Sequence, residues 1–394
     1  MRILCIGLDG RVGDPERGGH AVRWTREMAR LVDDYVVLAE SPDGRDSGPI
    51  PLEHNASAWL LGGSPAAYPF RAARLALRLH AASPFDLCTT EDPIRAGLAG
   101  ALFAARAHVP LNVENHSLHI NEPVWLRERP HHRIYNRIAI SVVRRADSIR
   151  NYSPDQDDAL IRVGVRRNRI YVAPPPFHAC PSVDRGEARA RFDLGESEAV
   201  VLSAGRMVSY KNLGTLIDAF AALRGSRKAR LLLAGDGPAR AAWRERARAT
   251  GLNGSIRWLD ALPEDDMPAL YHACDAFVAP ALHETGPRTV LEALSCDRPV
   301  VATPRMGVVH AGVCVHGESA LVVPPNDASG MADALEMLLA DSRWARRLAM
   351  EGHARAADIC SVRAIARSVA GMYRETVHRA RSEERLAAAS APLG

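Results

Sequence analysis

The sequence predicts an α/β protein made of two doubly wound domains, each with its own hydrophobic core. Three observations support this class: a length of 394 residues with 47% hydrophobic residues, a regular alternation of apolar and amphipathic stretches, and one proline-rich interruption near the middle. A single domain is not expected, because hydrophobic cores stop growing at roughly 250–300 residues.

Short apolar runs bounded by turn residues predict buried strands. These runs are residues 2–7, 35–40, 110–116, 169–174, 199–205, 229–237, 256–262, 275–281, 298–304 and 320–325. The stretches between them, such as 133–147 and 212–224, carry apolar residues at helical spacing. Continuous apolar strands that alternate with amphipathic helices indicate parallel sheets covered by helices on both faces.

The interruption is residues 173–186, APPPFHACPSVDRG, which contain four prolines and no periodicity. This segment is the predicted hinge between the two domains. Doubly wound sheets bind ligands at the carboxyl ends of their strands, so we expect the site in the cleft between the domains. The last residues, 383–394, are predicted to form a disordered tail.

Composition excludes several classes of partner. The net charge of +4 is mild for this length, so nucleic acid is not an expected partner. No run approaches the roughly 20 apolar residues of a membrane-spanning helix, and the apolar start, MRILCIG, is too short for a signal peptide. The seven cysteines are scattered and never spaced as CxxC, which predicts reduced thiols in a cytoplasm.

Two glutamates, Glu284 and Glu292, stand eight positions apart in HETGPRTVLEALS. Gly286-Pro287 predicts a helix that starts at Pro287 and ends near Cys296, with Glu284 in the loop before it and Glu292 inside it. The free N–H groups of its first turn, those of Arg288 and Thr289, would form an anion site. The alternative is that both carboxylates are ordinary surface charges.

A second group of candidates lies in SAGRMVSYKN, which follows the strand 199–205. Gly205, Arg206 and Lys211 fall in the loop at the carboxyl end of that strand. The planar fork of Arg and the point charge of Lys together suit a pyrophosphate. Only Lys211 and Lys228 are lysine among 50 cationic residues, and Lys228 lies in a predicted surface turn. The alternative is a solvated charge.

The pattern GR-x4-K followed by E-x7-E resembles the retaining glycosyltransferases of glycosyltransferase family four, which have the GT-B fold. The resemblance covers nearly the whole chain and includes LLLAGDGP (231–238), LVVPPND (321–327) and RRADSIRNYSPDQDDAL (144–160). ERGGH (16–20) looks like the glycine loop of the family, and VENHSLHI places His116 where the family has a histidine near the donor sugar.

The resemblance implies two Rossmann-like domains that face each other across a cleft. Residues 1–175 would bind the acceptor, and residues 186–361 would bind the nucleotide sugar. A C-terminal helix of about 362–382 would pack back on the first domain.

The resemblance also implies roles for single residues. Arg206 and Lys211 would bind the diphosphate, Glu292 the ribose and Glu284 the sugar hydroxyls, with His116 near the sugar. These residues other than Glu292 form the expected catalytic set, and the remaining expected donor-binding residues are Gly18, Gly19, Leu262, Gly286, Arg288 and Thr289.

The implied activity is transfer of a sugar, with retention and without an enzyme nucleophile, from a nucleoside-diphosphate sugar. A UDP-sugar is favoured over a GDP-sugar, and the acceptor would be a saccharide, a lipid-linked molecule or a small molecule. No metal and no obligatory cofactor are expected. The protein would be a monomer or homodimer in the cytoplasm or at the inner face of the cell membrane as a peripheral protein.

Three departures from the family pattern are present. Gly286-Pro287 stands where the family usually has Phe-Gly, which removes one backbone donor. Pro175-Pro176-Phe177 replaces the usual Pro-Asn-Gly turn, and Arg288 adds a charge beside the phosphate site.

The segment 121–137, NEPVWLRERPHHRIYNR, is the expected acceptor-facing loop. Trp125 and the cations Arg127, Arg129 and Arg133 would suit a phosphorylated sugar acceptor or an anionic lipid surface. The alternative is an ordinary solvated loop.

Two metal-site patterns have simpler interpretations. Asp155 and Asp157 have DxD spacing, but Ser153-Pro154 before them predicts a helix N-terminus that favours acidic residues. The group His116, His119, His131 and His132 has no cysteine or carboxylate pair at zinc-ligand spacing, so we expect these histidines on loops and helix surfaces.

Other functions stay open. A GT-B nucleotide-sugar epimerase would convert its nucleotide sugar without an acceptor. A catalytically inactive partner subunit would share the fold, and an exported two-domain sugar-binding protein would normally carry a signal that this sequence lacks.

Overall fold

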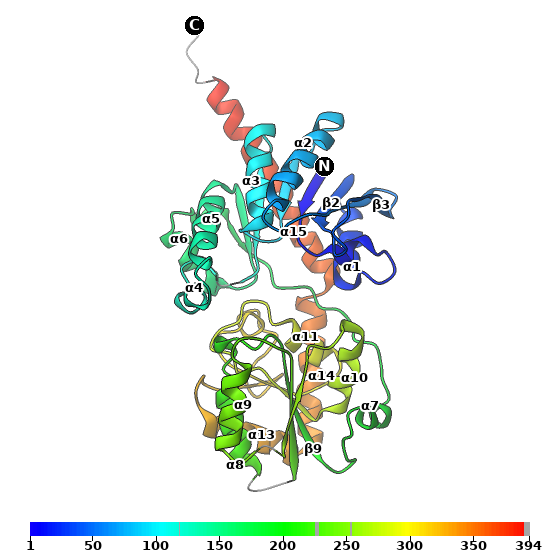
Figure 1. The fold of residues 1–394 in the computed structure, drawn as a ribbon, viewed down its shortest axis with the longest axis vertical. Helices are drawn as coiled ribbons and strands as arrows, with labels where there is room; N and C mark the ends of the chain where they lie inside the picture. The colour runs from blue at the N-terminus through cyan, green and yellow to red at the C-terminus, as the bar shows by residue number, and fades with distance from the viewer. Residues whose placement is uncertain (118, 225–227, 253, 390–394) are drawn as a thin grey trace. The chain divides into compact units, whose positions relative to one another are not determined.

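The chain divides into two compact units, each built around a mostly parallel β-sheet with helices on both faces (Figure 1). The computed structural model describes residues 1–117, 119–224, 228–252 and 254–389. Unit 1 comprises Met1–Ala173 and Val362–Gly394, and unit 2 comprises Pro174–Ser361. The predicted α/β class with two doubly wound sheets is confirmed.

Unit 1 holds an eight-stranded sheet in the order β3-β4-β2-β1-β5-β6-β7-β8. Its strands are β1 (Arg2–Ile6), β2 (Asp34–Glu40), β3 (Ser47–Glu53), β4 (Ala56–Leu61), β5 (Leu87–Thr90), β6 (Leu111–Asn115), β7 (Ser148–Asn151) and β8 (Ile170–Val172). The prediction of purely parallel sheets is wrong at one edge, because β3 pairs antiparallel with β4. β3 is mostly exposed and contains two prolines, which only an edge strand tolerates.

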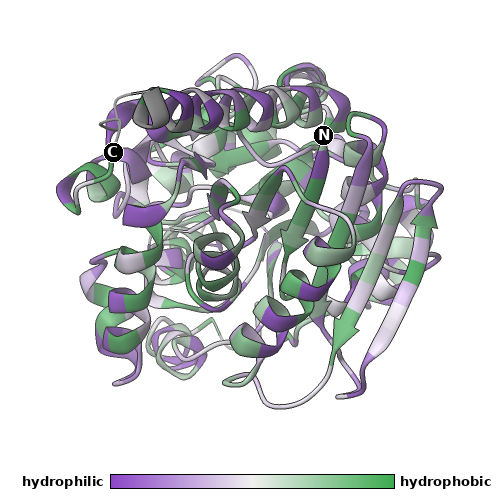
Figure 2. Cartoon of the chain, turned by 90° about the horizontal axis from the view of Figure 1, so that it is seen from above, coloured by the Kyte–Doolittle hydropathy of each residue, from purple (hydrophilic) through white to green (hydrophobic). Residues whose placement is uncertain are grey.

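The helices of unit 1 include one that comes from the far end of the sequence. They are α1 (Gly19–Ala29), α2 (Tyr68–Ala82), α3 (Arg95–Ala107), α4 (Pro123–Glu128), α5 (His132–Arg145), α6 (Asp157–Arg162) and α15 (Val362–Ala389). Hydrophilic and hydrophobic residues alternate along α15 (Figure 2). Ile365, Val369 and Tyr373 on this helix are buried in the same core cluster as strands β1 and β2.

α15 runs to Ala389, beyond the predicted end near residue 382. The predicted disorder of 383–394 is therefore wrong for residues 383–389, which continue the helix, and residues 390–394 lie outside the described part of the chain. The alanine- and arginine-rich end favours helix more strongly than we expected.

Unit 2 holds a six-stranded sheet in the order β11-β10-β9-β12-β13-β14. Its strands are all parallel: β9 (Ala199–Ala204), β10 (Ala229–Ala234), β11 (Ile256–Leu259), β12 (Ala276–Val278), β13 (Val300–Ala302) and β14 (Leu321–Val322). The strand order reverses between β9 and β12, and this switch point is where such sheets bind ligands.

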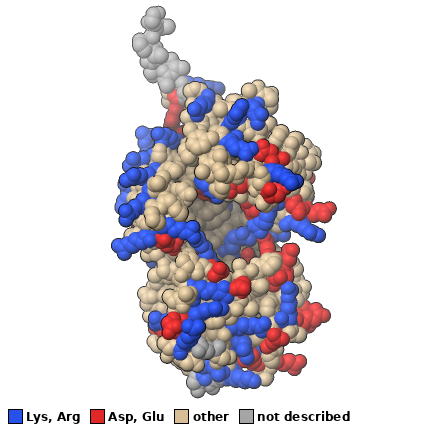
Figure 3. Space-filling model, in the orientation of Figure 1, with Lys and Arg blue, Asp and Glu red and all other residues tan. Residues whose placement is uncertain are grey.

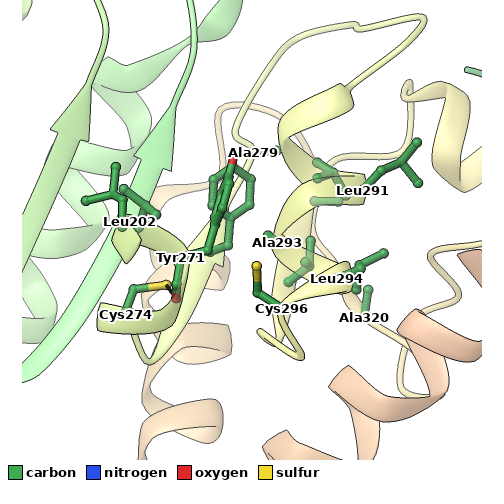
Figure 4. Close-up of a cluster of buried hydrophobic side chains, with 14 of the residues drawn as sticks. Leu202, Tyr271, Cys274, Ala279, Leu291, Ala293, Leu294, Cys296 and Ala320 are labelled. Atoms are coloured by element: carbon green, nitrogen blue, oxygen red, sulfur yellow. Dashed lines mark hydrogen bonds between the residues drawn. The ribbon is translucent and has the colours of Figure 1, made fainter. Parts of the chain in front are cut away.

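The helices of unit 2 cover both faces of this sheet. They are α7 (Arg185–Arg191), α8 (Leu213–Arg224), α9 (Arg240–Ala249), α10 (Met267–Ala273), α11 (Arg288–Ser295), α12 (Gly307–His310), α13 (Ala328–Ala340) and α14 (Ser342–Ile359). One face of the sheet packs on α10 and α11, with Leu202, Tyr271, Leu291 and Cys296 in the cluster shown in Figure 4. α11 is preceded by Pro287 as its N-cap residue, close to the predicted start.

The cysteines differ from the expectation of reduced thiols. Cys180 and Cys296 form a disulfide in unit 2, with their Cα atoms 5.7 Å apart, whereas Cys5, Cys88, Cys274, Cys314 and Cys360 are free and buried. The pairing joins residues separated by 116 positions, which no local spacing reveals. Among the described residues, no helix is long and apolar enough to span a bilayer.

Candidate functional site

A small pocket opens at the switch point of unit 2, between the carboxyl ends of β9 and β12. The loop after β9 contributes Gly205, Arg206 and Lys211, and the segment after β12 contributes Glu284 and, at the start of α11, Thr289. Its other lining residues are Ser203, Ala204, Leu213, Ala234, Ala279, Pro280 and Ala281. The structure thus brings together four of the residues expected at the donor site, Arg206, Lys211, Glu284 and Thr289, and places Gly205 beside them.

Lys211 and Glu284 are the central pair of this pocket. The Nζ of Lys211 donates to the Glu284 carboxylate, and their side chains are only 15% and 17% exposed. Partial removal from water strengthens such a pair. The backbone of Glu284 is held on both sides, because its N–H donates to Arg305 O (2.9 Å) and its carbonyl accepts from Gly307 N–H (2.8 Å). The carboxylate is therefore fixed at the pocket wall.

The loop after β9 depends on a close approach of two glycines. A Cβ on Gly235, at the end of β10, would lie 2.0 Å from the carbonyl oxygen of Gly205. Both residues have positive φ, +140° for Gly205 and +129° for Gly235, a conformation that side chains disfavour. This packing places Arg206 and Lys211 at the pocket, where Arg206 is exposed and Lys211 half-buried.

The start of α11 places at the pocket one of the two residues that we predicted for an anion site. Thr289 lines the pocket, but the N–H of Arg288 donates to Gly286 O at 2.9 Å. The prediction that Arg288 N–H would be free is therefore wrong, because the Gly286-Pro287 turn takes up this donor. The guanidinium of Arg288 is 3.6 Å from the Glu292 carboxylate.

Glu292 lies on α11 with its side chain 33% exposed, so it is not a fully solvated surface charge. Its carboxylate accepts a hydrogen bond of 2.7 Å from the Tyr271 hydroxyl on α10. Burial, followed by the charge of Glu292, raises the pKa of Tyr271 well above its ordinary value. Leu262 packs against the core beneath these helices. Neither Glu292 nor Leu262 lines the small pocket.

In unit 1, His116 belongs to a buried polar cluster at the ends of β6 and β7. Its Nε2 is 2.6 Å from the Glu114 carboxylate, and Arg150 pairs with the same carboxylate at 3.1 Å. Burial alone would raise the pKa of Glu114, but Arg150 and the His116 hydrogen bond lower it to about 2. The His116 ring stacks on Tyr152 with centroids 4.3 Å apart. Its neighbours therefore orient the imidazole.

Gly18 and Gly19 lie at the start of α1. A Cβ on Gly18 would lie 2.3 Å from a methyl group of Val22 and 2.4 Å from Arg11 O, and Gly19 has φ +55°. Packing within unit 1 therefore already requires a glycine at position 18, and the backbone conformation at position 19 favours one.

The sequence interpretation missed several polar residues at the same end of the unit 1 sheet. Glu91 follows β5, and a Cβ on Gly7, after β1, would lie 2.2 Å from its carboxylate. Burial, then the nearby Glu114, raises the pKa of Glu91 to about 7. Glu114 and Arg150 face each other across β6 and β7, a pairing that a single sequence does not reveal.

The segment 121–137 is more ordered than the predicted loop, because it forms α4 and the start of α5. Trp125 stacks on His119 (4.7 Å) and on His132 (4.3 Å). His132 is buried, and its Nδ1 is 2.7 Å from Trp125 O, so the expectation of a surface histidine is wrong there. Trp125 thus links α4 to α5 through its contact with His132, and its side chain stays partly exposed.

The cations of this segment remain at the surface. Arg127, Arg129 and Arg133 are exposed, and Ile134, which follows Arg133 in the sequence, is 58% exposed. In Figure 3, Lys and Arg gather on the side of unit 1 that carries α4, α5 and α6. An exposed cationic surface suits an anionic acceptor.

The DxD spacing has the structural explanation that the sequence indicated. Ser153 and Gln156 form a capping box at this helix start. Asp157 is buried and accepts from Asn151 (2.7 Å) and from Arg167. Its carboxylate is therefore engaged within unit 1.

Comparison with known proteins gives consistent matches in both units. The family described as glycosyl transferases group 1 matches residues 184–355, and the glycosyl transferase 4-like domain matches residues 18–176. Alpha-D-kanosaminyltransferase of Streptomyces kanamyceticus is 30% identical over 276 residues, which cover 68% of this chain and 71% of that protein.

Two further similarities concern a second relative and a solved structure. The lipopolysaccharide core biosynthesis glycosyltransferase LpsE of Rhizobium meliloti is 36% identical over 165 residues, which are 42% of this chain but only 46% of LpsE. The structure of Anabaena HepE in complex with UDP-glucose has a TM-score of 0.72 and 20% identity, and the match covers 95% of this chain and 100% of that chain. At this identity the likeness shows the fold alone.

Proposed function

The chain belongs to the glycosyl transferases group 1 family and has the GT-B fold, and on this premise we propose that it is a retaining glycosyltransferase with a nucleoside-diphosphate sugar as donor. The observation that carries the proposal is the half-buried Lys211–Glu284 pair at the switch point of unit 2. A cation and a carboxylate side by side match a donor in which phosphates adjoin sugar hydroxyls.

The cationic side of the pocket suits the diphosphate. Arg206 offers a planar fork of donors and Lys211 a point charge, and Thr289 adds the first turn of α11, whose dipole favours an anion. When phosphate oxygens bind Lys211, they compete with Glu284 for its ammonium group. Glu284 is then available to accept hydrogen bonds from the sugar hydroxyls.

Glu292 is the proposed ribose ligand. One oxygen of its carboxylate accepts from Tyr271, the other lies 3.6 Å from Arg288, and these contacts limit its rotamers. A carboxylate held in this way can accept from a pair of vicinal hydroxyls with little loss of side-chain entropy. A UDP-sugar is our favoured donor, by analogy with HepE, whose structure contains UDP-glucose.

Unit 1 would bind the acceptor. His116 is the proposed contact near the donor sugar, and Arg127, Arg129 and Arg133 form a cationic surface for a phosphorylated saccharide or a lipid-linked acceptor. This surface also suits peripheral contact with anionic lipid at the inner face of the cell membrane.

The proposed chemistry needs no enzyme nucleophile. The acceptor oxygen bonds to the anomeric carbon as the bond to the diphosphate oxygen breaks, and the acceptor proton passes to the leaving diphosphate on the same face. Arg206 and Lys211 stabilise the negative charge that develops on the diphosphate, and Glu284 positions the sugar.

Calorimetric titration with UDP, GDP and ADP tests this proposal. We expect one nucleotide to bind, and Lys211→Ala to weaken its binding by about 10- to 100-fold, because charged hydrogen bonds contribute roughly 1.5–3 kcal/mol. Lys228→Ala is the matched control, since Lys228 is exposed and outside the pocket. Equal binding by Lys211→Ala, or no binding of any nucleotide, would overturn the donor site.

A further inference from the structure

The Cys180–Cys296 pair is chemically distinct from the other cysteines. Burial raises the pKa of Cys274, Cys314 and Cys360 to about 12, and Cys5 and Cys88 are also buried. Such thiols are poor nucleophiles. Cys180, in contrast, is half-buried between the exposed residues Ala179 and Pro181. Small reagents can therefore reach this pair at Cys180, whereas Cys296 is 2% exposed and the other thiols are buried.

The segment around Cys180 and Pro181 is attached to two helices of unit 2, α10 and α11. The disulfide joins Cys180 to Cys296, which ends α11 as its C-cap residue. Next to it, His272 Nε2 on α10 is 3.2 Å from Pro181 O. The same two helices are bridged by the hydrogen bond from Tyr271 to Glu292, one turn before Cys296. Figure 4 shows Tyr271 and Cys296 within one core cluster.

These contacts form a closed loop of links. The disulfide connects Cys180 to the end of α11, which carries Glu292. The hydrogen bond from Tyr271 connects Glu292 to α10, and His272 on α10 contacts Pro181, the residue after Cys180. The disulfide is the loop's one covalent link across elements, and without it the segment keeps the His272–Pro181 contact and the hydrogen bonds of Arg185 to Cys274 O (3.2 Å) and Asp275 (2.6 Å). The oxidation state of the pair therefore affects the rigidity of the helix that carries Glu292 and Thr289.

We propose that Cys180 and Cys296 are a site of reversible thiol oxidation that stabilises unit 2 and tightens its nucleotide site. In the oxidation step, two thiols form one S–S bond, and two electrons and two protons pass to a low-molecular-weight disulfide, which becomes two thiols. A low-molecular-weight dithiol reverses the step by thiol–disulfide exchange. The part of this proposal that concerns nucleotide affinity rests on the proposed function.

The first experiment treats the folded full-length protein with glutathione buffers of graded redox ratio, alkylates free thiols, and maps peptides by mass spectrometry. We expect one crosslinked pair of peptides, containing residues 180 and 296, that disappears at reducing ratios, while the five buried cysteines stay unmodified until denaturation. Failure to crosslink, or a crosslink that excess dithiothreitol cannot reduce in the folded state, would overturn the proposal.

The second experiment measures thermal unfolding of the oxidised and reduced protein without nucleotide. Reduction should lower the midpoint by on the order of 5–15 °C, because the closed loop is long. Cys180→Ser, chosen because Cys180 is not buried, should melt like the reduced protein in either buffer. Cys314→Ala is the matched control from the same core cluster and should keep the full redox response. Identical midpoints in both states would contradict a stabilising role.

The third experiment compares UDP affinity in the two states. We expect about 2- to 5-fold weaker binding after reduction, and no redox dependence in Cys180→Ser. Equal affinity would remove the coupling to the nucleotide site. If UDP binds neither state, the proposed function fails, whereas peptide mapping and thermal unfolding still decide whether the redox site exists.

Discussion

Two buried carboxyl groups in unit 1 respond to burial in opposite ways. Glu114 has Arg150 and His116 as partners and stays ionised to about pH 2, so its contribution to stability is present above its ordinary pKa and is lost as the pH falls below it. For Glu91, burial and the nearby negative charge of Glu114 both disfavour the ionised carboxylate, and they raise its pKa to about 7. Its protonated form is therefore favoured in the folded state below about pH 7.

The raised pKa of Glu91 gives a prediction with a definite sign. A group whose pKa is higher in the folded state stabilises below its unfolded pKa, and this stability is lost as the pH rises through the folded pKa. Glu91→Gln should therefore be more stable than the wild type by about 3 kcal/mol at pH 8 and nearly equal to it at pH 4.5. Urea unfolding between pH 4.5 and 8 measures this difference.

The control for this experiment is Glu16→Gln, which changes an exposed carboxylate of the same unit. It should follow the wild type at every pH. A Glu91→Gln profile parallel to the wild type would show that Glu91 ionises normally in the folded protein.

Substitution of Glu284 should affect sugar transfer and nucleotide affinity differently. Glu284→Ala should reduce transfer by on the order of 100-fold, while UDP affinity stays equal or improves, because Lys211 loses its internal partner. Initial rates with a transferred sugar and calorimetry with UDP measure the two effects. Glu245→Ala, on an exposed carboxylate of unit 2 outside the pocket, is the control. Near-normal transfer by Glu284→Ala would contradict its assigned role.

At the scale of elements, the donor pocket depends on the backbone contact between two strand ends. Gly235→Ala would place a methyl group 2.0 Å from Gly205 O, in a backbone conformation that is itself strained. The loop bearing Arg206 and Lys211 must then move. We expect UDP binding to weaken by about 10-fold or more, together with a loss of about 1–3 kcal/mol in unfolding free energy.

Gly251→Ala is the control for Gly235→Ala, because it introduces backbone strain without a steric clash that would displace a loop. Gly251 also has positive φ (+70°), but nothing lies within 4 Å of an added Cβ. This variant should lose about 1–2 kcal/mol of stability and keep its UDP affinity. Equal UDP affinity in both variants would show that the contact between Gly205 and Gly235 does not position the pocket.

The sequence predicted the elements whose signal is local. Long apolar runs gave β1, β2, β9 and β10, and Gly286-Pro287 gave the start of α11. β7, SIRN, was missed because its Arg150 suggests an exposed position, whereas the side chain is buried against Glu114. Only the register between β6 and β7 shows this pairing, and that register is not local.

Features of the site that depend on residues far apart in the chain could not be predicted either. That Gly205, Arg206, Lys211, Glu284 and Thr289 lie together follows from strand ends of a parallel sheet meeting at one edge, whereas their roles in binding stay predictions. The loss of the Arg288 donor and the pairing of Cys180 with Cys296 were not predicted, because they depend on turn geometry and on residues far apart in the chain.

At the scale of the whole molecule, the two units differ in continuity. Unit 2 is one uninterrupted stretch, Pro174–Ser361, whereas unit 1 needs Val362–Gly394 in addition to its first 173 residues. α15 contributes Ile365, Val369, Met372, Tyr373 and Val377 to the core of unit 1. The fold of unit 1 therefore depends on both ends of the chain.

Truncation tests this dependence. Residues 174–361 alone should unfold cooperatively on heating, and residues 1–173 alone should not, because the surface that α15 covers would be exposed. The full chain truncated after residue 382 is the control, since it keeps all five of these buried side chains and should melt like the wild type. Circular dichroism during heating measures each case, and a cooperative transition of 1–173 alone would contradict the prediction.

The discontinuity of unit 1 has a consequence during translation. Domains generally fold as units while the chain is being synthesised, so unit 2 can be complete on the ribosome before α15 has emerged. Throughout that interval, the part of the β1 and β2 face that α15 later covers stays open to solvent. The nascent chain thus carries an aggregation-prone surface for the time needed to make nearly 200 more residues. A holdase chaperone that binds this surface is expected to dissociate when Tyr373 and the other buried residues of α15 pack on it.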